Sequence, residues 1–418
     1  MKEPDFFAAI ESDTKKAILF IPHLPESFAV WMGPIHSTEY YKDLYKVDEV
    51  LYTDDIPAYF EKFAPEVVYV TKGQNSDSGN FAVPAHFDGI EKYNVDEKYL
   101  FEAITECRVI KTPKEMEIYR YVAKIGSQAH LDNMRAIEPE IYESQIESVF
   151  LHSNYFKGGC RHVSFIPICA SGRNSSILHY GHAGAPNDRQ MHDGEWLLMD
   201  MGSEYKCYAC DITTTCPVNG KFTDKQRFIY ETVLEMNRQC QLMMKPGVNW
   251  MDVHTHSNRV MIQRFLKEGL FQGDEEEILK SNVAGYFMPH GLGHFMGIDV
   301  HDVGGYTADM QRDTRMGYKS LRTRRDLAEG MLITVEPGVY FVDCCIDMIK
   351  KDPNMNKFVN WDKVMEYYPI GGCRIECDVY ITKDGCEDIT CAPRTVEDIE
   401  KAYSGEITSV DQIKSFVH

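Results

Sequence analysis

Residues 196–215 read WLLMDMGSEYKCYACDITTT, in which two apolar runs each carry one aspartate. The pattern predicts a β-hairpin whose turn is centred between Tyr205 and Lys206, and this register places Asp200 opposite Asp211. Opposed Cβ atoms lie about 4.5–5.5 Å apart, so two carboxylates among apolar neighbours would repel each other unless a cation lay between them. A divalent metal ion is the expected cation. The alternative is a shifted register that leaves one aspartate in solvent.

A second informative segment, residues 289–302, reads PHGLGHFMGIDVHD and contains three histidines among three glycines. The glycines disfavour a helix, which excludes the paired histidines of a zinc-protease helix. They allow backbone and ligands to approach each other closely instead. Because single histidines usually pack in a core or lie on the surface, this segment alone leaves a metal site and a structural role open.

Two later segments predict strands that carry charge. Residues 332–340, LITVEPGVY, form an apolar run that ends in Glu336 before a Pro-Gly turn. A glutamate in such a run is costly to bury unpaired, unless it lies exposed at the end of the strand. Residues 371–381, GGCRIECDVYI, place Arg374, Glu376 and Asp378 on one face of a strand. Taken alone, such a charged face is expected to point to solvent.

The composition excludes several classes of function. The 418 residues include 44 Lys and Arg against 64 Asp and Glu, a formal net charge of −20. This acidity repels nucleic acid and anionic membrane surfaces, so neither is expected as a partner. The sequence contains neither a secretory signal nor an apolar run that could span a bilayer. Thirteen cysteines, an odd number, fit reduced thiols better than a disulfide framework, which predicts a cytoplasmic protein.

The chain is predicted to form two domains of an α+β protein. Residues 1–110 alternate strand-like runs at 17–22, 49–53 and 66–71 with a helix at 56–63, the rhythm of a small α/β domain. Thr112-Pro113-Lys114-Glu115 forms a capping box at the start of a long helix, where the second domain, residues 111–418, is expected to begin. Further helices are predicted at 142–156, 223–244 and 251–268, with β-rich runs between them.

Together these segments closely resemble the metallopeptidases of the pita-bread fold, the group that includes methionyl aminopeptidase, aminopeptidase P and prolidase. The similarity is greatest to the prolidases, or Xaa-Pro dipeptidases. It covers nearly the whole chain and includes LHYGHAGAPND at 178–188, FMPHGLGHF at 287–295, SLRTR at 320–324 and TVEPG at 334–338. The resemblance implies a C-terminal pita-bread catalytic domain that follows a smaller α/β domain, here shortened by its opening strand and helix.

The resemblance also implies a centre of two divalent metal ions. Carried over by motif, the ligands are Asp200, Asp211, His294, Glu336 and Glu376, with Asp211 and Glu376 bridging the ions. Four carboxylates match the charge of two divalent cations, and oxygen-rich ligation suits manganese. The resemblance to prolidases, which usually prefer manganese, makes Mn²⁺ the expected ion, with Co²⁺ or Zn²⁺ as alternatives.

In this family a hydroxide that bridges the ions attacks the carbonyl before a C-terminal proline, which implies the same reaction here. Glu336 corresponds to the residue that passes a proton to the leaving nitrogen. His301 and His179 correspond to residues that stabilise the tetrahedral intermediate and contact the substrate, and His290 lies at a nearby position. Arg322 corresponds to the residue that binds the proline carboxylate, although without the resemblance it would be an ordinary surface arginine.

Two aromatic residues bear on substrate and partner. Phe165 stands where relatives often carry a tyrosine near the substrate, so one hydroxyl contact is expected to be missing. Trp31 matches a residue that caps the pocket of the partner subunit, which predicts a homodimer. The shortened N-terminal domain weakens that second expectation.

Three functions remain open at this stage. The first is an Xaa-Pro dipeptidase. The second is an aminopeptidase P that acts on longer peptides, against which the similarity to prolidases and Arg322 both argue. The third is a non-catalytic pita-bread binding protein, a type that typically lacks several of the ligands present here. Cys207, Cys210, Cys373 and Cys377 offer a further metal alternative, a zinc site, but their spacing on strands favours packing.

Overall fold

The computed structural model describes residues 4–76, 78–307 and 309–413. The chain divides into two compact units, Met1–Ile104 and Thr105–His418. The boundary expected after residue 110 lies six residues beyond this division. The outer limits of the expected domains, at residues 1 and 418, lie outside the described residues.

The first unit is built on the apolar strand β2 (Ala17–Ile21), which lies between antiparallel β1 (Phe7–Ile10) and parallel β3 (Glu49–Tyr52). Ile18 and Phe20 pack in one core cluster, and Leu19 packs in another on the opposite face. Because both faces are covered, β2 reads as a continuous apolar run. The other elements are α1 (Phe28–Met32), α2 (Thr38–Tyr45), α3 (Ile56–Phe63), β4 (Val68–Tyr69), β5 (Val95–Asp96) and α4 (Tyr99–Val109), which continues past the division.

Two pairs of packed helices support the second unit, α5 with α6 and α7 with α8. The predicted capping boxes are confirmed, since the hydroxyls of Thr112 and Thr223 accept hydrogen bonds from the backbone N–H groups of Glu115 and Gln226. The helices are α5 (Pro113–Ala136), α6 (Glu143–Gly158), α7 (Asp224–Met243), α8 (Trp250–Glu268), α9 (Glu275–Ser281), α10 (Asp343–Lys351), α11 (Pro353–Asn356), α12 (Trp361–Tyr367) and α13 (Val396–Ser404).

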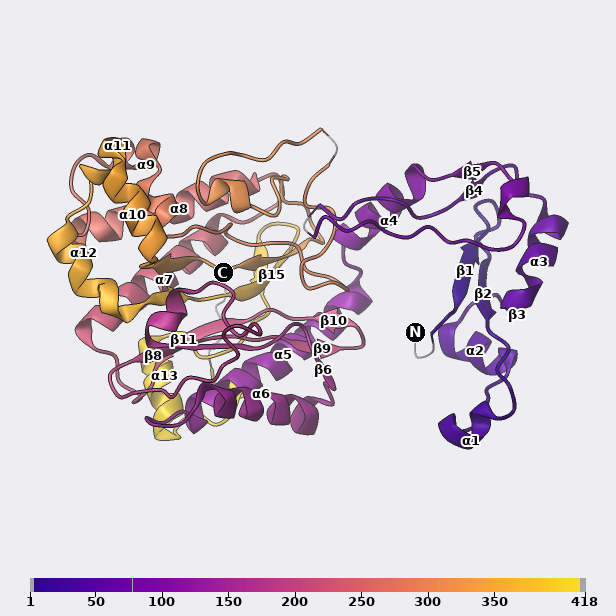
Figure 1. Cartoon of the computed structure of the whole chain (residues 1–418), viewed down its shortest axis with the longest axis horizontal. Helices are drawn as coiled ribbons and strands as arrows, with labels where there is room; N and C mark the ends of the chain where they lie inside the picture. The colour runs from indigo at the N-terminus through magenta and orange to yellow at the C-terminus, as the bar shows by residue number, and fades with distance from the viewer. Residues whose placement is uncertain (1–3, 77, 308, 414–418) are drawn as a thin grey trace. The chain divides into compact units, whose positions relative to one another are not determined.

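The strands of the second unit form small antiparallel sheets among these helices (Figure 1). Their orders are β10-β9-β6, β11-β8-β7, β12-β15-β16 and β13-β14. The bounds are β6 (His162–Val163), β7 (Ile168–Ser171), β8 (Trp196–Asp200), β9 (Ser203–Tyr205), β10 (Tyr208–Ala209), β11 (Thr213–Pro217), β12 (Leu332–Val335), β13 (Gly338–Tyr340), β14 (Gly372–Arg374), β15 (Cys377–Ile381) and β16 (Cys386–Asp388). Helices combined with antiparallel sheets confirm the predicted α+β class.

The segments 332–340 and 371–381 each break into two strands at a glutamate. β12 pairs with β15 and β13 with β14, so the breaks lie side by side. At the breaks, the N–H of Glu336 donates to the carbonyl of Leu292 at 2.9 Å, and the N–H of Glu376 donates to that of Thr213 at 3.0 Å. We call the paired segments 332–340 and 371–381 the broken ribbon. These hydrogen bonds connect the broken ribbon to the histidine segment, residues 289–302, and to the aspartate hairpin, residues 196–215.

The predicted register of the aspartate hairpin is wrong by two residues. Asp200 pairs with Thr213 rather than with Asp211. The turn is formed by Lys206 and Cys207, whose φ values are 54° and 69°. Positive φ at both central residues is typical of a type I′ hairpin turn, which usually contains Asn or Gly and was therefore not signalled by the sequence. Because the shift is even, both aspartates still face the same side of the ribbon.

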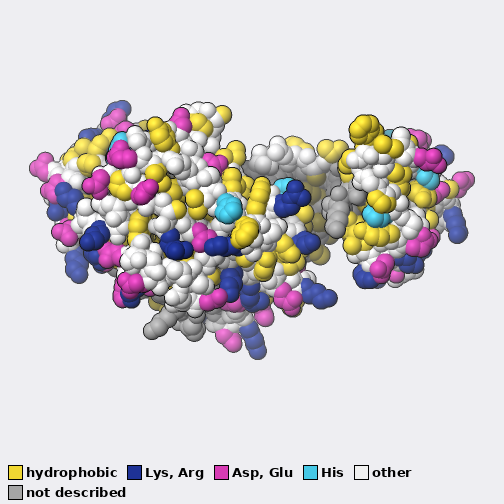
Figure 2. Space-filling model, turned by 90° about the horizontal axis from the view of Figure 1, so that it is seen from below, with side chains coloured by type: hydrophobic (Ala, Val, Ile, Leu, Met, Phe, Trp, Pro, Cys, Tyr) yellow, Lys and Arg dark blue, Asp and Glu magenta, His cyan; other side chains and the backbone are white. Residues whose placement is uncertain are grey.

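Charged side chains cover much of the surface of the second unit. On the face shown in Figure 2, acidic and basic side chains are interspersed over the second unit. Among the described residues, the helices lack the combination of length and apolar character that crossing a membrane requires.

Candidate metal centre

A cavity of about 250 Å³ opens in the second unit where the hairpin, the histidine segment and the broken ribbon meet. Nine of the predicted site residues line it: His179, Asp200, Asp211, His290, His294, His301, Arg322, Glu336 and Glu376. Phe165 is half-buried and is not among the lining residues. Trp31 belongs to α1 of the first unit, where 85% of its surface is exposed.

The five predicted metal ligands converge in this cavity. Asp200, Asp211 and Glu376 form one group in which ligand atoms lie within 4.8 Å of one another, and His294, Glu336 and Glu376 form a second. Glu376 is common to both groups. Two overlapping groups that share a carboxylate are the arrangement expected for two neighbouring cations.

His294 is oriented to present its Nε2 atom to the carboxylates. Its Nδ1 lies 3.0 Å from the carbonyl of Phe295 and donates to it, so Nε2 carries the lone pair. Nε2 lies 3.4 Å from Asp211 Oδ2 and 3.7 Å from Glu336 Oε1. The neighbouring Gly293 allows this approach, because a Cβ there would lie 2.0 Å from the carbonyl oxygen of Thr334.

The buried carboxylates of the cluster lie close enough to repel one another. Burial and the charges of Asp200 and Glu336 raise the pKa of Asp211 well above its ordinary value. Burial and the charge of Asp211 do the same to the pKa of Glu376. For Glu336 the effect of burial is outweighed by His290 and His294, which lower its pKa. Repulsion of this kind is relieved when a divalent cation binds.

Two oxygen atoms of the cluster are left free for a ligand. Among the described residues, Oδ1 of Asp200 and Oδ1 of Asp211 are buried and accept no hydrogen bond. A buried carboxylate oxygen without a hydrogen-bond partner costs free energy. Both of these oxygens belong to the group formed by Asp200, Asp211 and Glu376. Together with the imidazole lone pair of His294, these oxygens fit a site for oxygen-preferring divalent ions.

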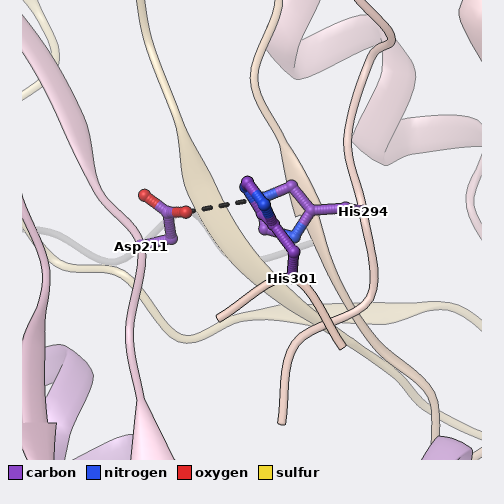
Figure 3. Close-up of side chains that lie close together, drawn as sticks. All are labelled: Asp211, His294 and His301. Atoms are coloured by element: carbon purple, nitrogen blue, oxygen red, sulfur yellow. Dashed lines mark ion pairs between the residues drawn. The ribbon is translucent and has the colours of Figure 1, made fainter. Parts of the chain in front are cut away.

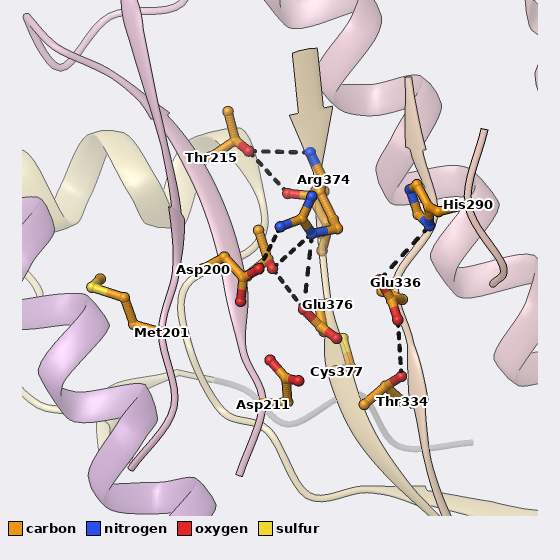
Figure 4. A network of polar contacts seen from close by, with 12 residues as sticks. Asp200, Met201, Asp211, Thr215, His290, Thr334, Glu336, Arg374, Glu376 and Cys377 are labelled. Atoms are coloured by element: carbon orange, nitrogen blue, oxygen red, sulfur yellow. Dashed lines mark hydrogen bonds and ion pairs between the residues drawn. The ribbon is translucent and has the colours of Figure 1, made fainter. Parts of the chain in front are cut away.

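Arg374 lies buried beside the cluster and organises two of its members, Asp200 and Glu376 (Figure 4). Its Nη2 donates to Asp200 Oδ2, and its Nε donates to Thr213 Oγ1 at 3.0 Å. Thr213 in turn donates to Glu376 Oε2 at 2.6 Å. The third donor, Nη1, reaches the hydroxyl of Tyr340 at 2.9 Å. Arg374 therefore fixes a carboxylate from each of two strands.

The expectation that Arg374, Glu376 and Asp378 face solvent is wrong. All three are at most 3% exposed. The Asp378 carboxylate accepts hydrogen bonds from the N–H of Asp211, at 3.2 and 3.3 Å. The strand face is polar because it forms the wall of the site.

Residues suited to proton transfer and polar contacts stand at the edge of the cluster. The His301 ring lies 4.4 Å from the His294 ring, between centroids (Figure 3). Burial lowers the pKa of His301 to about 4, and the charge of His294 acts in the same direction. His290 Nδ1 lies 3.8 Å from Glu336 Oε2, and Thr334 Oγ1 donates to Glu336 Oε1 at 3.3 Å. Neutral His301 can donate or accept a hydrogen bond in the cavity.

Arg322 lines the cavity together with Arg374. Arg322 is partly buried, and burial lowers its pKa while the charges of Glu336 and Glu376 act in the opposite direction. His179 lines the same cavity and is exposed to solvent. A guanidinium at this position can bind a substrate carboxylate with two parallel hydrogen bonds.

The cysteines do not join any candidate metal group. Among the described residues, the groups that could hold a metal ion consist of Asp, Glu and His. Cys207 is exposed in the hairpin turn, whereas Cys210, Cys373 and Cys377 are buried. The packing interpretation of these cysteines is therefore the better one.

Sequence reasoning assigned no role to several residues that shape the site. Arg374 carried a usable signal, because the period of two places it on the same strand face as Glu376. Thr213, Thr334 and Tyr340 carried none, since each acts through a contact that only the folded chain creates.

Comparison with known proteins assigns the family. Residues 117–383 match metallopeptidase family M24, and residues 1–69 match the N-terminal domain of aminopeptidase P. The Xaa-Pro dipeptidase of Mus musculus is 47% identical over 403 residues, which cover 96% of this chain and 82% of the mouse protein. The probable Xaa-Pro aminopeptidase pepP of Talaromyces marneffei is 38% identical over 411 residues, 96% of this chain and 85% of the fungal protein.

Solved structures give the same assignment. Aminopeptidase PepP of Pseudomonas aeruginosa superposes with a TM-score of 0.76 and 28% identity, covering 96% of this chain and 86% of that one. Aminopeptidase P from Escherichia coli with the inhibitor Pro-Leu gives a TM-score of 0.74 and 30% identity, covering 93% of this chain and 83% of that one. The chain belongs to metallopeptidase family M24, with a pita-bread catalytic domain that follows an aminopeptidase P-type N-terminal domain.

Proposed function

We propose that this protein is an Xaa-Pro dipeptidase, which hydrolyses the bond before the C-terminal proline of a dipeptide. The observation that carries the proposal is that Arg322 shares one cavity with all five predicted ligands. A dipeptidase must bind the free carboxylate next to the scissile bond, and a guanidinium suits that role. The similarity to mammalian Xaa-Pro dipeptidases over 96% of the chain supports the same substrate class.

The proposed metal centre holds two divalent ions. Asp200, Asp211, His294, Glu336 and Glu376 would hold these ions. When bound, the ions supply Lewis-acid activation of the scissile carbonyl and acidify the attacking water. Manganese is the proposed metal, with cobalt or zinc as alternatives, because four of the five ligands are carboxylates.

The chain's own residues supply the remaining steps. Glu336 accepts the proton released from the attacking water and delivers it to the proline nitrogen as the bond breaks. His301 and His179 donate hydrogen bonds to the charge that develops on the carbonyl oxygen. His290 lies beside Glu336, 3.8 Å from its Oε2, and is fixed by two contacts: its Nδ1 donates to the Gly291 carbonyl at 2.7 Å, and its Nε2 lies 3.0 Å from the Tyr340 hydroxyl. Arg322 orients the substrate through its carboxylate, and Phe165 is proposed to leave one substrate contact without a hydroxyl.

The wider organisation follows the same proposal. We take residues 1–110 and 111–418 as the functional domains. The protein is proposed to act as a homodimer in which Trp31, exposed on α1, caps the partner's site. The odd number of cysteines favours the cytoplasm as its compartment.

A second candidate is an aminopeptidase P that removes the first residue from longer peptides. The fungal relatives that are 37–39% identical carry the name probable Xaa-Pro aminopeptidase. Arg322 separates the two activities, because a peptide that continues beyond proline has no carboxylate at this position.

The test compares Gly-Pro with a pentapeptide that has proline second, on protein stripped with chelator and reloaded with manganese. A dipeptidase releases proline from Gly-Pro and leaves the pentapeptide intact. Cleavage of the pentapeptide at a comparable rate would favour aminopeptidase P. If neither substrate is cleaved and the protein binds negligible metal, a non-catalytic binding role would be favoured.

A further inference from the structure

Asn237, on helix α7, bonds to both strands that carry the metal-ligand glutamates. It is 1% exposed. Its Nδ2 donates to the carbonyl of Val335 at 2.8 Å and to the carbonyl of Ile375 at 3.4 Å. These carbonyls belong to the residues directly before Glu336 and Glu376. One side-chain amide therefore links the two strands at the point where each of them breaks.

This geometry fixes the peptide planes from which the glutamates project. A peptide group is planar, so its orientation is set once its oxygen and its nitrogen are both bonded. The plane before Glu336 is bonded at its oxygen by Asn237 and at its nitrogen through the carbonyl of Leu292. The plane before Glu376 is bonded at its oxygen by Asn237 and at its nitrogen through the carbonyl of Thr213. Asn237 is the partner that the two planes share.

The orientation of the Asn237 amide is itself fixed. Gln241, one helical turn further along α7, donates from Nε2 to Asn237 Oδ1 at 2.9 Å. The same nitrogen donates to Asp388 Oδ2 at 3.2 Å, and Asp388 forms a buried ion pair with Arg394. With Oδ1 engaged by Gln241, the amide nitrogen faces the two carbonyls.

We propose that Asn237 is a positioning residue of the metal centre, which aims Glu336 and Glu376 at the ion they share with His294. The inference rests on the metal centre proposed above. Groups that orient metal ligands from behind typically contribute about 10- to 100-fold to metal affinity. Asn237 acts through the backbone, so its substitution misaligns two ligands at once although no ligand residue is itself replaced.

Three variants separate this role from a merely structural one. Asn237→Asp keeps the size of the side chain and replaces the donor with an acceptor that faces two carbonyls. Asn237→Leu removes the hydrogen bonds and keeps the bulk. Gln241→Ala retains Asn237 but removes the hydrogen bond that fixes the orientation of its amide. The matched control is Asn258→Leu on helix α8, a buried asparagine whose amide contacts His254 and no ligand-bearing strand.

The measurement is Mn²⁺ binding to chelator-stripped protein, followed by electron paramagnetic resonance, with the folded fraction checked by circular dichroism. We expect the Asn237 variants to bind at least one Mn²⁺ ion about 10- to 100-fold more weakly than the parent. The affinity of Gln241→Ala should lie between those of the Asn237 variants and the parent. Asn258→Leu should bind Mn²⁺ as tightly as the parent. The visible bands of the Co²⁺-loaded protein should shift in the Asn237 variants and in Gln241→Ala, and not in Asn258→Leu.

The inference would be overturned if folded Asn237 variants bound Mn²⁺ as tightly as the parent and showed an unshifted cobalt spectrum. It would also be overturned if Asn258→Leu lost as much affinity for Mn²⁺ as the Asn237 variants. If neither Asn237 variant folds, Gln241→Ala decides by the same criteria. A parent protein that binds no metal would instead overturn the proposed function, so the two failures are distinguishable.

Discussion

The Arg374 guanidinium donates a hydrogen bond to Oδ2 of Asp200, and both side chains are buried in the wall of the cavity. Arg374 is a buried cation that offsets the carboxylate charge of the cluster. Burial disfavours its charged form, but the facing groups, Asp200 and Glu376 among them, raise its pKa well above the ordinary value. The Arg374–Asp200 pair therefore has two effects: it stabilises the folded protein when no metal is bound, and it holds the Asp200 carboxylate in position.

Removing this cation should destabilise the metal-free protein. Arg374→Met leaves buried carboxylates without their partner, a change that typically costs about 3–5 kcal/mol of unfolding free energy. Arg374→Lys retains the charge but not the planar fork, so its loss should be smaller. Urea unfolding of chelator-treated protein measures both values. A metal-free Arg374→Met protein as stable as the parent would show that Arg374 does not balance these charges.

Asp211, a proposed ligand, and Asp378, which lies behind it on β15, should differ in their effect on metal binding. Asp211→Asn removes the charge of a proposed ligand and should abolish most bound metal and most activity. Asp378→Asn alters only a side chain that accepts from the Asp211 N–H, so about a 10-fold weaker affinity is expected. Elemental analysis after equilibrium dialysis gives the stoichiometries. Equal losses in the two variants would contradict the proposed ligand set.

Arg322 should determine the requirement for a free C-terminal carboxylate. Arg322→Met is expected to raise KM for Gly-Pro about 10- to 100-fold, because a hydrogen-bonded charge pair contributes about 1.5–3 kcal/mol. The parent should discriminate strongly against Gly-prolinamide, and the variant should not. Arg324→Met is the control, since Arg324 is in the same segment but does not line the cavity. Unchanged discrimination in Arg322→Met would exclude the carboxylate role.

A buried histidine away from the ligands should make folding sensitive to acid. Burial lowers the pKa of His254 to about 3, and the charges of His290 and Arg315 act in the same direction. The unfolded chain, with an ordinary pKa near 6.5, takes up the proton first, so this contribution to stability is present above about pH 6.5 and is lost as the pH falls toward 3. Between about pH 7 and pH 5 the loss amounts to about 2 kcal/mol.

Unfolding free energies of the parent and His254→Gln across that pH range check this expectation. The variant should start less stable but show a shallower dependence on pH. Parallel curves for the two proteins would mean that His254 does not titrate in this way.

The parts of the fold that depend on local signals were predictable. The capping boxes at Thr112 and Thr223 mark the starts of α5 and α7, and the helix predicted at 56–63 coincides with α3 (Ile56–Phe63). The motifs also predicted which ligand residues would meet in one cavity. The helix starts depend on capping and periodicity, which can be read along the chain, whereas the set of expected ligands was implied by the family resemblance.

The features that the sequence did not predict depend on contacts between distant segments. The hairpin register is set by positive φ at Lys206 and Cys207, which neither residue type signals. The burial of Arg374 and Asp378 follows from the meeting of two sheets, and Asn237 is an ordinary residue of α7 until the broken strands pack against it. Such roles appear only when the folded chain is considered.

The most direct test of the account is proline release from Gly-Pro by chelator-stripped protein as Mn²⁺ is added. The account predicts no activity without metal and a return of activity that is complete at two equivalents per chain. Activity that persists in the stripped protein, or that fails to return although two ions bind, would contradict the assignment of hydrolysis to the centre formed by Asp200, Asp211, His294, Glu336 and Glu376.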